Sequence, residues 1–401
     1  MTEPDAVFAF LVAFAVAAIL TPVTARFAVR VGAVDRPKER GLGTGSTPLL
    51  GGLAMLAATL IASWLFLDFG GPMADRLRGI MGGAILIALI GALDDRFDLP
   101  PGAKLFGQVL AACVPVAAGV EVENITLPFI GPVTFGTAGG PITVIGLVAV
   151  MNVVNLSDGI DGLAAGVCAI SAVAFSIIAF DLDRNHAGVL AAIIAGAAGG
   201  FLVHNFHPAS VYMGDCGSNL LGLLLGCVAV EGSVKTQAVL ALVFPLVVLA
   251  VPFLDTTFVV LKRMKSHRPV YRGDASHFHH RFSRIGFSHR RTVLYLYAWT
   301  VVLAAFAVAL RFVPYSDHAG NLHAGWAAVM GAIGLLVLAA SAYLVYVLEI
   351  LKIKRLDMMR VRRLRPDASE AEIEADVHER LETGEFDAVR RETEEFEQIQ
   401  G

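Results

Sequence analysis

Long apolar runs alternate with short polar segments along this chain. About twenty apolar residues in a helix cross the hydrocarbon layer of a bilayer, and we count about eleven such runs, several of them short. They cover residues 6–26, 49–67, 78–93, 104–120, 141–154, 162–180, 186–205, 218–230, 237–261, 292–310 and 326–351. Backbone groups in lipid must be hydrogen-bonded within the chain. The pattern therefore predicts an all-α polytopic membrane protein.

Composition supports this fold class. Of 401 residues, 56% are hydrophobic and only 16% are charged, which is unusual for a soluble domain. We predict an integral membrane domain over residues 1–351 and a cytoplasmic tail over 352–401, first basic and then acidic. The cysteines are scattered without a Cys-x-x-Cys pair, so they indicate no disulfide framework.

The distribution of Lys and Arg predicts the orientation. Basic residues cluster after the first, ninth and last runs, whereas the alternate connections hold little beyond Arg76, Arg184 and Lys235. By the positive-inside rule, the amino terminus lies outside and the carboxyl terminus in the cytoplasm. The first run is preceded by acids rather than by a basic region, so we expect no cleaved signal peptide. Residues 121–141 predict a small extracytoplasmic hairpin.

Four polar segments interrupt the apolar pattern: residues 94–98, 155–162, 213–218 and 277–281. Ionisable residues beside hydrocarbon are costly, and their presence indicates function. In the predicted topology all four segments lie on the cytoplasmic side. The sequence therefore predicts one site that faces the cytoplasm.

The first segment contains adjacent acids, Asp94 and Asp95. Neighbouring carboxylates repel each other unless a cation lies between them, and a divalent metal, a lysine or a proton-accepting role would explain the pair. Lys104 and Gln108 follow closely enough to meet a phosphate. The alternative is a solvated helix end with Arg96 as the counter-ion.

The next two segments add more polar groups. Asn155, Asp158 and Asp161 are spaced by three, which predicts a shared helical face. Asp215 lies between glycines and is equally compatible with metal binding and with capping a helix. Tyr212 would stack on a base or pack in the bundle.

The last segment is rich in histidine. His277, His279, His280 and Arg281 suit phosphate better than zinc, because the chain has no Cys pair and no His-Glu-x-x-His. Acids that favour a divalent cation thus face bases that favour phosphate. This combination predicts phosphoryl transfer between a lipid phosphate and a soluble phosphorylated donor.

Several motifs occur in a fixed order along the chain. They are Gly-Ala-Val-Asp-Arg-Pro at 32–37, Pro-Leu-Leu-Gly-Gly at 48–52, and the four polar segments. In this order the chain resembles the polyprenyl-phosphate N-acetylhexosamine-1-phosphate transferases of glycosyltransferase family 4. The His-x-His-His-Arg form resembles the branch that uses N-acetylglucosamine phosphate with undecaprenyl or decaprenyl phosphate. The phospho-N-acetylmuramoyl-pentapeptide translocase branch is the alternative.

The resemblance implies the reaction and its components. N-acetylglucosamine-1-phosphate would pass from a UDP-sugar to polyprenyl phosphate with release of UMP, initiating cell-wall or surface polysaccharide synthesis. The cofactor would be Mg²⁺, or Mn²⁺, with Asp215 as its ligand. The expected partners are the lipid phosphate, the UDP-N-acetylhexosamine and the bilayer. A homodimer is compatible with the resemblance, and no nucleic-acid partner is expected. The active site would face the cytoplasm at the inner or plasma membrane.

The resemblance also implies residue roles. The catalytic residues would be Asp94, Asp95, Asp158, Asp161, His279 and His280, and the substrate-binding residues would be Asn155, Asn205, Tyr212, Lys104, His277 and Arg281. One departure concerns the first cytoplasmic loop, where relatives often carry Lys and His and this chain has Gly41 and Gly43. Arg36, Lys38 or Arg40 would then bind the phosphate that the Lys and His bind in relatives.

Two other classes fit parts of the sequence. Residues 94–98 also match the Asp-Asp-x-x-Asp of intramembrane prenyltransferases, which need a second acid-rich segment of similar type and lack the histidine run. A proton- or metal-coupled transporter would use the acids as ion sites. Transporters tend to show internal repeats with sites near the midplane, and here the acids lie at the ends of the spans.

Overall fold

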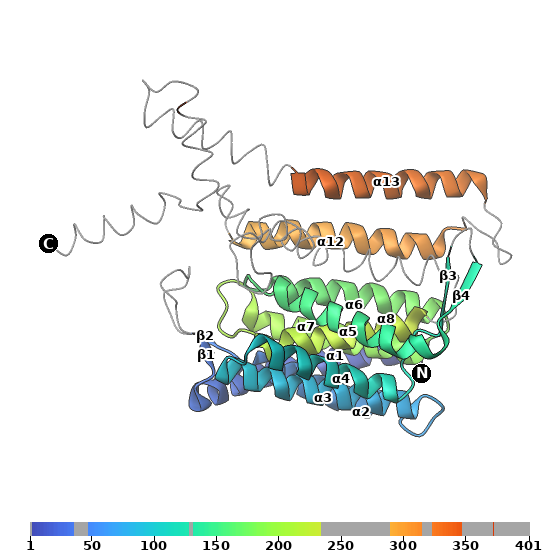
Figure 1. Ribbon diagram of the computed structural model, residues 1–401. Coiled ribbons are helices and arrows are strands. Elements are labelled where there is room, and N and C mark those ends of the chain that lie inside the picture. Colours follow the sequence, from blue (N-terminus) through green and yellow to red (C-terminus); the bar gives the residue numbers. More distant parts are fainter. Residues whose placement is uncertain are drawn as a thin grey trace. The chain divides into compact units, whose positions relative to one another are not determined.

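The computed structural model describes residues 2–35, 47–127, 131–233, 289–314, 323–346 and 372. Its helices are α1 (Glu3–Val31), α2 (Gly51–Phe66), α3 (Ala74–Phe97), α4 (Pro101–Ala117), α5 (Gly139–Ser157), α6 (Leu163–Asp181), α7 (Asn185–Asn205), α8 (Gly214–Ser233), α12 (His289–Phe312) and α13 (Ala324–Tyr346), with a short 3-10 turn at Gly136–Ala138. The strands are β1 (Val34–Asp35), β2 (Thr47–Pro48), β3 (Asn124–Leu127) and β4 (Gly131–Thr134). Figure 1 shows this order.

The predicted fold class is confirmed. Seven described helices, α1, α3, α5, α6, α7, α12 and α13, are long and apolar enough to cross a membrane, and α2 and α4 are apolar but shorter. Every expected span except the ninth coincides with a described helix. The ninth, residues 237–261, lies outside the described residues, as does the predicted tail apart from Glu372. The protein is thus an all-α polytopic membrane protein.

Two compact units divide the chain, the first of residues 1–283 and 287–334 and the second of 284–286 and 335–401. Within the first unit, α1 packs along α7, and both α3 and α5 pack against α8. Small residues permit the close approach: a Cβ at Gly196 of α7 would lie 2.2 Å from the carbonyl oxygen of Phe10 in α1. The core draws buried apolar side chains from most of these helices, and α7 and α8 contribute many, such as Ile193, Leu220 and Leu224.

The first long connection folds back onto the bundle. β1 and β2 pair antiparallel, with Val34 opposite Pro48. The amide of Gly51 then donates to the carbonyl of Tyr212, and the amide of Gly52 to that of Met213. The motif at residues 48–52 therefore anchors the start of α2 beside the start of α8.

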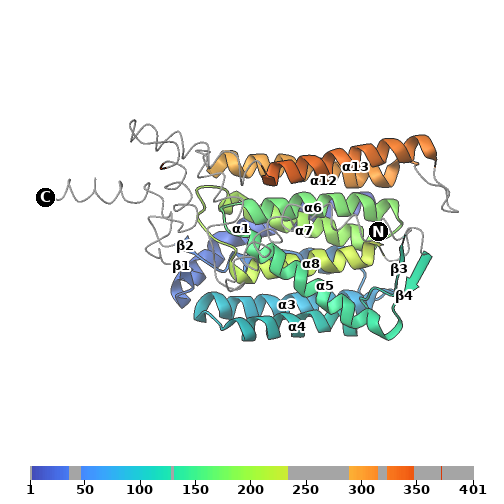
Figure 2. The same ribbon diagram turned by 45° about the horizontal axis from the view of Figure 1, so that its top comes forward.

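The helix ends define two ends of this unit (Figures 1 and 2). At the end that we call the site end, α3 and α5 finish and α4, α6 and α8 begin, next to β1 and β2. At the other, the hairpin end, β3 and β4 form an antiparallel hairpin with Asn124 opposite Thr134. The predicted hairpin is confirmed. The three described polar segments all lie at the site end, which confirms that they share one end of the bundle.

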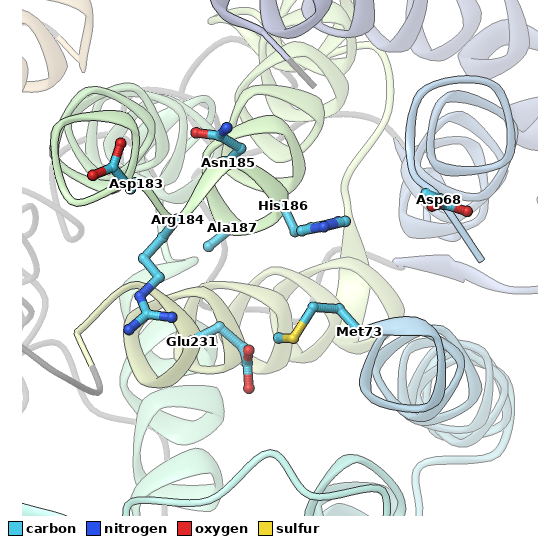
Figure 3. A pocket seen from close by; sticks show the side chains of 8 residues that line it. All are labelled: Asp68, Met73, Asp183, Arg184, Asn185, His186, Ala187 and Glu231. Atoms are coloured by element: carbon cyan, nitrogen blue, oxygen red, sulfur yellow. The ribbon is translucent and has the colours of Figure 1, made fainter. Parts of the chain in front are cut away.

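The hairpin end contains a cavity of about 340 Å³ between the starts of α3 and α7 and the end of α8 (Figure 3). Its lining residues are Asp68, Met73, Asp183, Arg184, Asn185, His186, Ala187 and Glu231. Glu231 is buried, and its carboxylate lies 3.4 Å from the guanidinium of Arg76. Figure 3 shows Arg184 reaching toward the same carboxylate.

Candidate functional site

The two adjacent acids of α3 have different surroundings. The Asp95 carboxylate accepts the backbone N–H groups of Asp215, at 2.7 Å, and of Cys216, at 3.1 Å. Gly214 has φ +66°, and a Cβ there would lie 2.3 Å from the Asp95 carboxylate. Asp95 thus caps α8 from a neighbouring helix, where a negative charge also stabilises the helix dipole. The alternative that Asp215 itself caps this helix is wrong, because Asp215 lies inside its first turn.

Asp94 points into the cluster instead. Its side chain is buried, one oxygen accepts the N–H of Leu99 at 2.8 Å, and the other lies 3.4 Å from Nζ of Lys104. Arg96 lies over the ring of Phe97, 5.2 Å from its centroid. The alternative of a solvated helix end with Arg96 as counter-ion is therefore wrong for Asp94, since its ion partner is Lys104.

Lys104 links the acids of two helices. Its ammonium group contacts Oδ2 of Asp215 and lies 3.3 Å from Oδ1 of Asn155. Asn155 in turn donates to Oδ1 of Asp215 and, at 2.9 Å, to Oγ of Ser218. The polar segments thus meet through Lys104 and Asp215, at the junction of α3, α4, α5 and α8. Of the three explanations for the adjacent acids (a divalent metal, a lysine or a proton-accepting role), the structure shows a lysine beside Asp94.

Asn155, Asp158 and Asp161 do not share a helical face, so this prediction is wrong. α5 ends at Ser157, and Asp158 has non-helical angles of φ −81° and ψ 53°. Asp161 lies in the following turn, where its carboxylate contacts Nδ1 of His207 at 2.8 Å and accepts the N–H of Ala209 at 3.1 Å. The turn that separates them contains Gly159 and Gly162, and Gly162 has φ +81°. Asn155 therefore points to Asp215, while Asp161 holds the loop after α7.

Asp158 lies close to several negative charges. Burial, together with the nearby carboxylates of Asp215, Asp95 and Asp161, raises the pKa of Asp158 to about 8. At neutral pH this carboxyl is therefore mainly protonated. The site end thus holds more carboxyl groups than Lys104 can pair with, and a bound cation would favour their ionised forms.

The donor atoms fit a hard divalent cation in part. The oxygens of Asp94, Asp215 and Asn155 come from the groups that Mg²⁺ prefers, and Mg²⁺ usually takes one or two carboxylates and completes its shell with water and substrate phosphates. Within the described part of the chain, no group of three His, Cys, Asp or Glu side chains could hold a metal ion. The cluster therefore fits a cation shared with a phosphate ligand better than a closed protein cage.

Comparisons with known proteins bear on this cluster. The model for "Glycosyl transferase family 4" matches residues 77–233, which span α3 to α8 and contain every described contact between the acids, Lys104 and Asn155. The chain is 33% identical over 309 residues to the "Probable undecaprenyl-phosphate N-acetylglucosaminyl 1-phosphate transferase" of Bacillus subtilis (strain 168), covering 76% of this chain and 85% of that one. The chain belongs to glycosyl transferase family 4.

Two further members are similar over comparable lengths. The "Decaprenyl-phosphate N-acetylglucosaminephosphotransferase" of Mycolicibacterium smegmatis is 36% identical over 312 residues, 71% of this chain and 77% of that one. The "Phospho-N-acetylmuramoyl-pentapeptide-transferase" of Desulforudis audaxviator is 34% identical over 330 residues, 74% of this chain and 96% of that one. Both branches of the family therefore resemble this chain.

Other residues predicted from the family motifs have structural contacts. Asn205 is buried, its Oδ1 accepts the N–H of Gly162 at 3.0 Å, and its Nδ2 donates to the carbonyl of Val211 at 2.9 Å. The backbone N–H of Tyr212 donates to the carbonyl of Pro48, and burial raises the pKa of its phenol. Asn205 thus joins the loops that precede α6 and α8. A nucleoside contact of Asn205 and Tyr212 stays a prediction.

Part of the predicted site lies outside the described residues. This holds for the histidine-rich segment with His277, His279, His280 and Arg281. It also holds for the first loop with Gly41, Gly43, Arg36, Lys38 and Arg40. The roles of these residues remain predictions.

Gln108 shows what the sequence reasoning missed. Its side chain is 1% exposed and bonded to Asn219 and Asn152, so the prediction that it meets a phosphate is wrong. A sequence signal existed: Gln108 follows Lys104 by four residues, and Asn219 follows Asp215 by four. Both pairs therefore occupy successive turns of one helix face.

Proposed function

We propose that this protein transfers N-acetylglucosamine-1-phosphate from UDP-N-acetylglucosamine to polyprenyl phosphate. A phosphate oxygen of the lipid attacks the β-phosphorus of the donor, the bond from that phosphorus to the bridging oxygen breaks, and UMP leaves with that oxygen. The products are polyprenyl-diphosphate-N-acetylglucosamine and UMP. The observation that carries the proposal is the cluster of Asp94, Asp215 and Asn155 around Lys104, at one end of an apolar bundle. Family members named for polyprenyl-phosphate substrates support it.

The residues of the cluster have separable tasks in this reaction. Lys104 would compensate phosphate charge, because its ammonium group already lies among oxygen acceptors at the cluster's centre. Asp94 would orient the lipid phosphate or accept its proton, while Asp95 would hold the start of α8 and so the backbone of Asp215. Asp215 and Asn155 would hold Mg²⁺ or Mn²⁺, which adds positive charge to the donor diphosphate when bound.

The topology proposed from the sequence fits this chemistry. The basic segments that follow the first and ninth spans in the sequence predict a cytoplasmic side, and α1 ends and α12 begins at the site end. The described connections at the hairpin end have few basic residues. By the positive-inside rule we place the site end in the cytoplasm, with about eleven spans and the amino terminus outside. A UDP-sugar made in the cytoplasm would then reach the site without crossing the plasma membrane.

The choice of branch rests on the histidine run at residues 277–281. Identity alone does not separate the branches, since named members of both lie between 33% and 36%. The His-x-His-His-Arg form favours the N-acetylglucosamine branch. The muramoyl-pentapeptide donor is the second candidate, favoured by a match that covers 96% of the Desulforudis protein.

The test is a donor panel with purified protein in nanodiscs. Undecaprenyl phosphate, Mg²⁺ and one UDP-sugar at a time would be supplied, and UMP and the lipid product would both be quantified by mass spectrometry. We expect equal amounts of UMP and lipid-linked product with UDP-N-acetylglucosamine, and neither without the lipid. Product only with UDP-muramoyl-pentapeptide would move the protein to the translocase branch. No product with any donor would refute the proposal.

A further inference from the structure

The residues around Lys104 have counterparts one helical turn further into the bundle. On α4, Gln108 follows Lys104 by four residues, and on α8, Asn219 follows Asp215 by four. On α5, Asn152 precedes Asn155 by three. We call Lys104, Asn155 and Asp215 the upper tier, and Gln108, Asn152 and Asn219 the lower tier. Both tiers link the same three helices.

The lower tier is a directional chain of amide hydrogen bonds. Asn152 donates to the side-chain oxygen of Gln108 at 2.7 Å, and Gln108 donates to that of Asn219 at 2.8 Å. Asn219 in turn donates to the backbone carbonyl of Asp215 at 2.8 Å. If any of these side-chain amide groups were rotated by 180°, its NH2 group would face another NH2 group or its oxygen would face another oxygen. The chain therefore fixes one register among α5, α4 and α8.

Burial makes this register energetically important. Gln108 and Asn219 are 1% and 2% exposed, and a buried amide costs free energy unless its polar atoms are bonded. Apolar side chains of similar size would fill the same space without that requirement. Three polar residues directly beneath the cluster therefore point to a need for fixed geometry rather than for stability alone.

Three buried hydroxyl groups elsewhere in the described bundle behave differently. Thr21, Ser157 and Thr300 each donate to the carbonyl four residues earlier in their own helix. Such bonds satisfy a polar group but join no neighbouring helix. Asn152 and Asn219 also donate to the carbonyl four residues earlier, those of Val148 and Asp215. Gln108 differs, because its amide bonds to both of them and so joins α4 to α5 and to α8.

We propose that Gln108, Asn152 and Asn219 are positioning residues, which set the spacing of Lys104, Asn155 and Asp215 by clamping the three helices one turn away. They touch no substrate themselves. The inference rests on the proposed function for its kinetic readout. Small displacements of reacting groups can cost about 100-fold in rate, so a slightly altered helix spacing would suffice for a large effect.

The test compares a variant that interrupts the lower tier at one residue with a variant in which all three of its amides are replaced by apolar side chains. Gln108→Met leaves the Asn219 oxygen without its donor, whereas the triple variant Gln108→Met, Asn152→Leu and Asn219→Leu removes all three amides together. Thr300→Val is the matched control, since it removes a buried hydroxyl whose hydrogen bond among the described residues lies within its own helix. Each protein would be measured in nanodiscs for Tm, for kcat and KM with UDP-N-acetylglucosamine, and for Mn²⁺ affinity by electron paramagnetic resonance.

The positioning role predicts that stability and activity separate. Gln108→Met should lower Tm, and it should lower kcat and Mn²⁺ affinity by at least about tenfold. The triple variant should regain Tm, because no polar group is left unpaired, and yet keep the low kcat and weak Mn²⁺ binding. Thr300→Val should leave kcat unchanged.

Other results would overturn the inference. Recovery of kcat and Mn²⁺ affinity together with Tm in the triple variant would show that the tier is only structural. If the triple variant does not fold, the Gln108→Met variant decides. A kcat and an Mn²⁺ affinity equal to those of the wild type would then show that the tier is only structural. If the wild type released no UMP with any donor, the proposed function would fail instead, and the Mn²⁺ affinities alone would decide the role of the tier.

Discussion

The two ends of the first unit both hold charged groups between helices, but they balance charge differently. At the hairpin end, one buried acid, Glu231, lies 3.4 Å from Arg76 and near Arg184 (Figure 3). At the site end, the carboxylates of Asp94 and Asp215 contact Lys104, and burial together with nearby carboxylates raises the pKa of Asp158 to about 8. The hairpin end has the matched charges of a structural contact. The site end has more carboxyl groups than Lys104 can pair with, which would favour a bound cation and, through that cation, a phosphate.

Hydrogen bonding differs in the same way. At the site end, Asp95 accepts two N–H groups at the start of α8, and Asp215 accepts the side-chain amide of Asn155. At the hairpin end, the Arg76–Glu231 contact borders an open cavity of about 340 Å³. The comparison teaches that hydrogen bonds between helices, and not only charge, distinguish the end at which we place the chemistry.

The largest difference should come from removing one cation at each end. Lys104→Met should lower kcat on the order of 10³-fold, because its ammonium group is proposed to stabilise phosphate charge. Arg76→Met at the hairpin end should lower Tm and leave kcat within about threefold, since a broken ion pair affects folding alone. UMP release and Tm of both variants in nanodiscs would test this. Equal losses of kcat would remove the functional distinction between the ends.

The adjacent acids offer a sharper comparison within the site end. Asp95→Ala removes the cap of α8 and should lower Tm by several degrees, since a lost cap costs about 1 kcal/mol. Asp94→Ala should lower kcat about 100-fold and lower Tm less than Asp95→Ala does, because Lys104 keeps Asp215 as its ion partner. Thermal unfolding and initial rates would be compared. The assignment would be reversed if Asp94→Ala unfolded earlier and Asp95→Ala did not.

Charge crowding at the site end should also make stability depend on pH. The pKa of Asp158 is raised to about 8 in the folded protein and stays near 4 in the unfolded chain. Between these values only the folded state binds the proton, so the Asp158 contribution to stability is present at low pH and falls as pH rises toward 8. Without metal, the Tm of Asp158→Asn relative to wild type should therefore rise from pH 5 to pH 9. A constant difference would show that Asp158 ionises freely in the folded protein.

The smallest effect should come from an exposed pair at the hairpin end. Asp75 and Arg78 lie one turn apart on α3, with the Arg78 guanidinium 3.0 Å from the Asp75 carboxylate, and both side chains are largely exposed. Such pairs contribute about 0.5 kcal/mol. Asp75→Ala should therefore change Tm by less than about 2 °C and leave kcat unaltered. A larger loss of kcat would mean that the hairpin end also takes part in the reaction.

The sequence predicted the helices and the shared end of the polar segments, because both follow from local rules. Apolar runs must become helices in lipid, and alternate connections must lie on the same side. The details failed where contacts join distant segments. The spacing of Asn155 and Asp158 suggests one helical face, yet α5 ends between them at Ser157.

The different tasks of the two adjacent acids were likewise beyond sequence reasoning. Asp94 and Asp95 are neighbours in one motif, and only the packing of α3 against α8 turns one toward Lys104 and the other toward the amides of α8. The position of Gln108 soon after Lys104 suggests a phosphate contact, whereas one helical turn places it beneath the cluster. Register between helices decides these roles, and a single sequence does not encode it in any local pattern.

The most direct test of the central claim compares Asp215→Asn with Glu231→Gln. Both changes neutralise an acid of α8, one at each end of the helix, and UMP release from UDP-N-acetylglucosamine would be measured in nanodiscs with undecaprenyl phosphate and Mg²⁺. We predict that Asp215→Asn lowers kcat by at least about 10³-fold at unchanged folding, while Glu231→Gln retains wild-type kcat within about threefold. Wild-type turnover in Asp215→Asn would contradict the claim that the cluster around Lys104 is the active site.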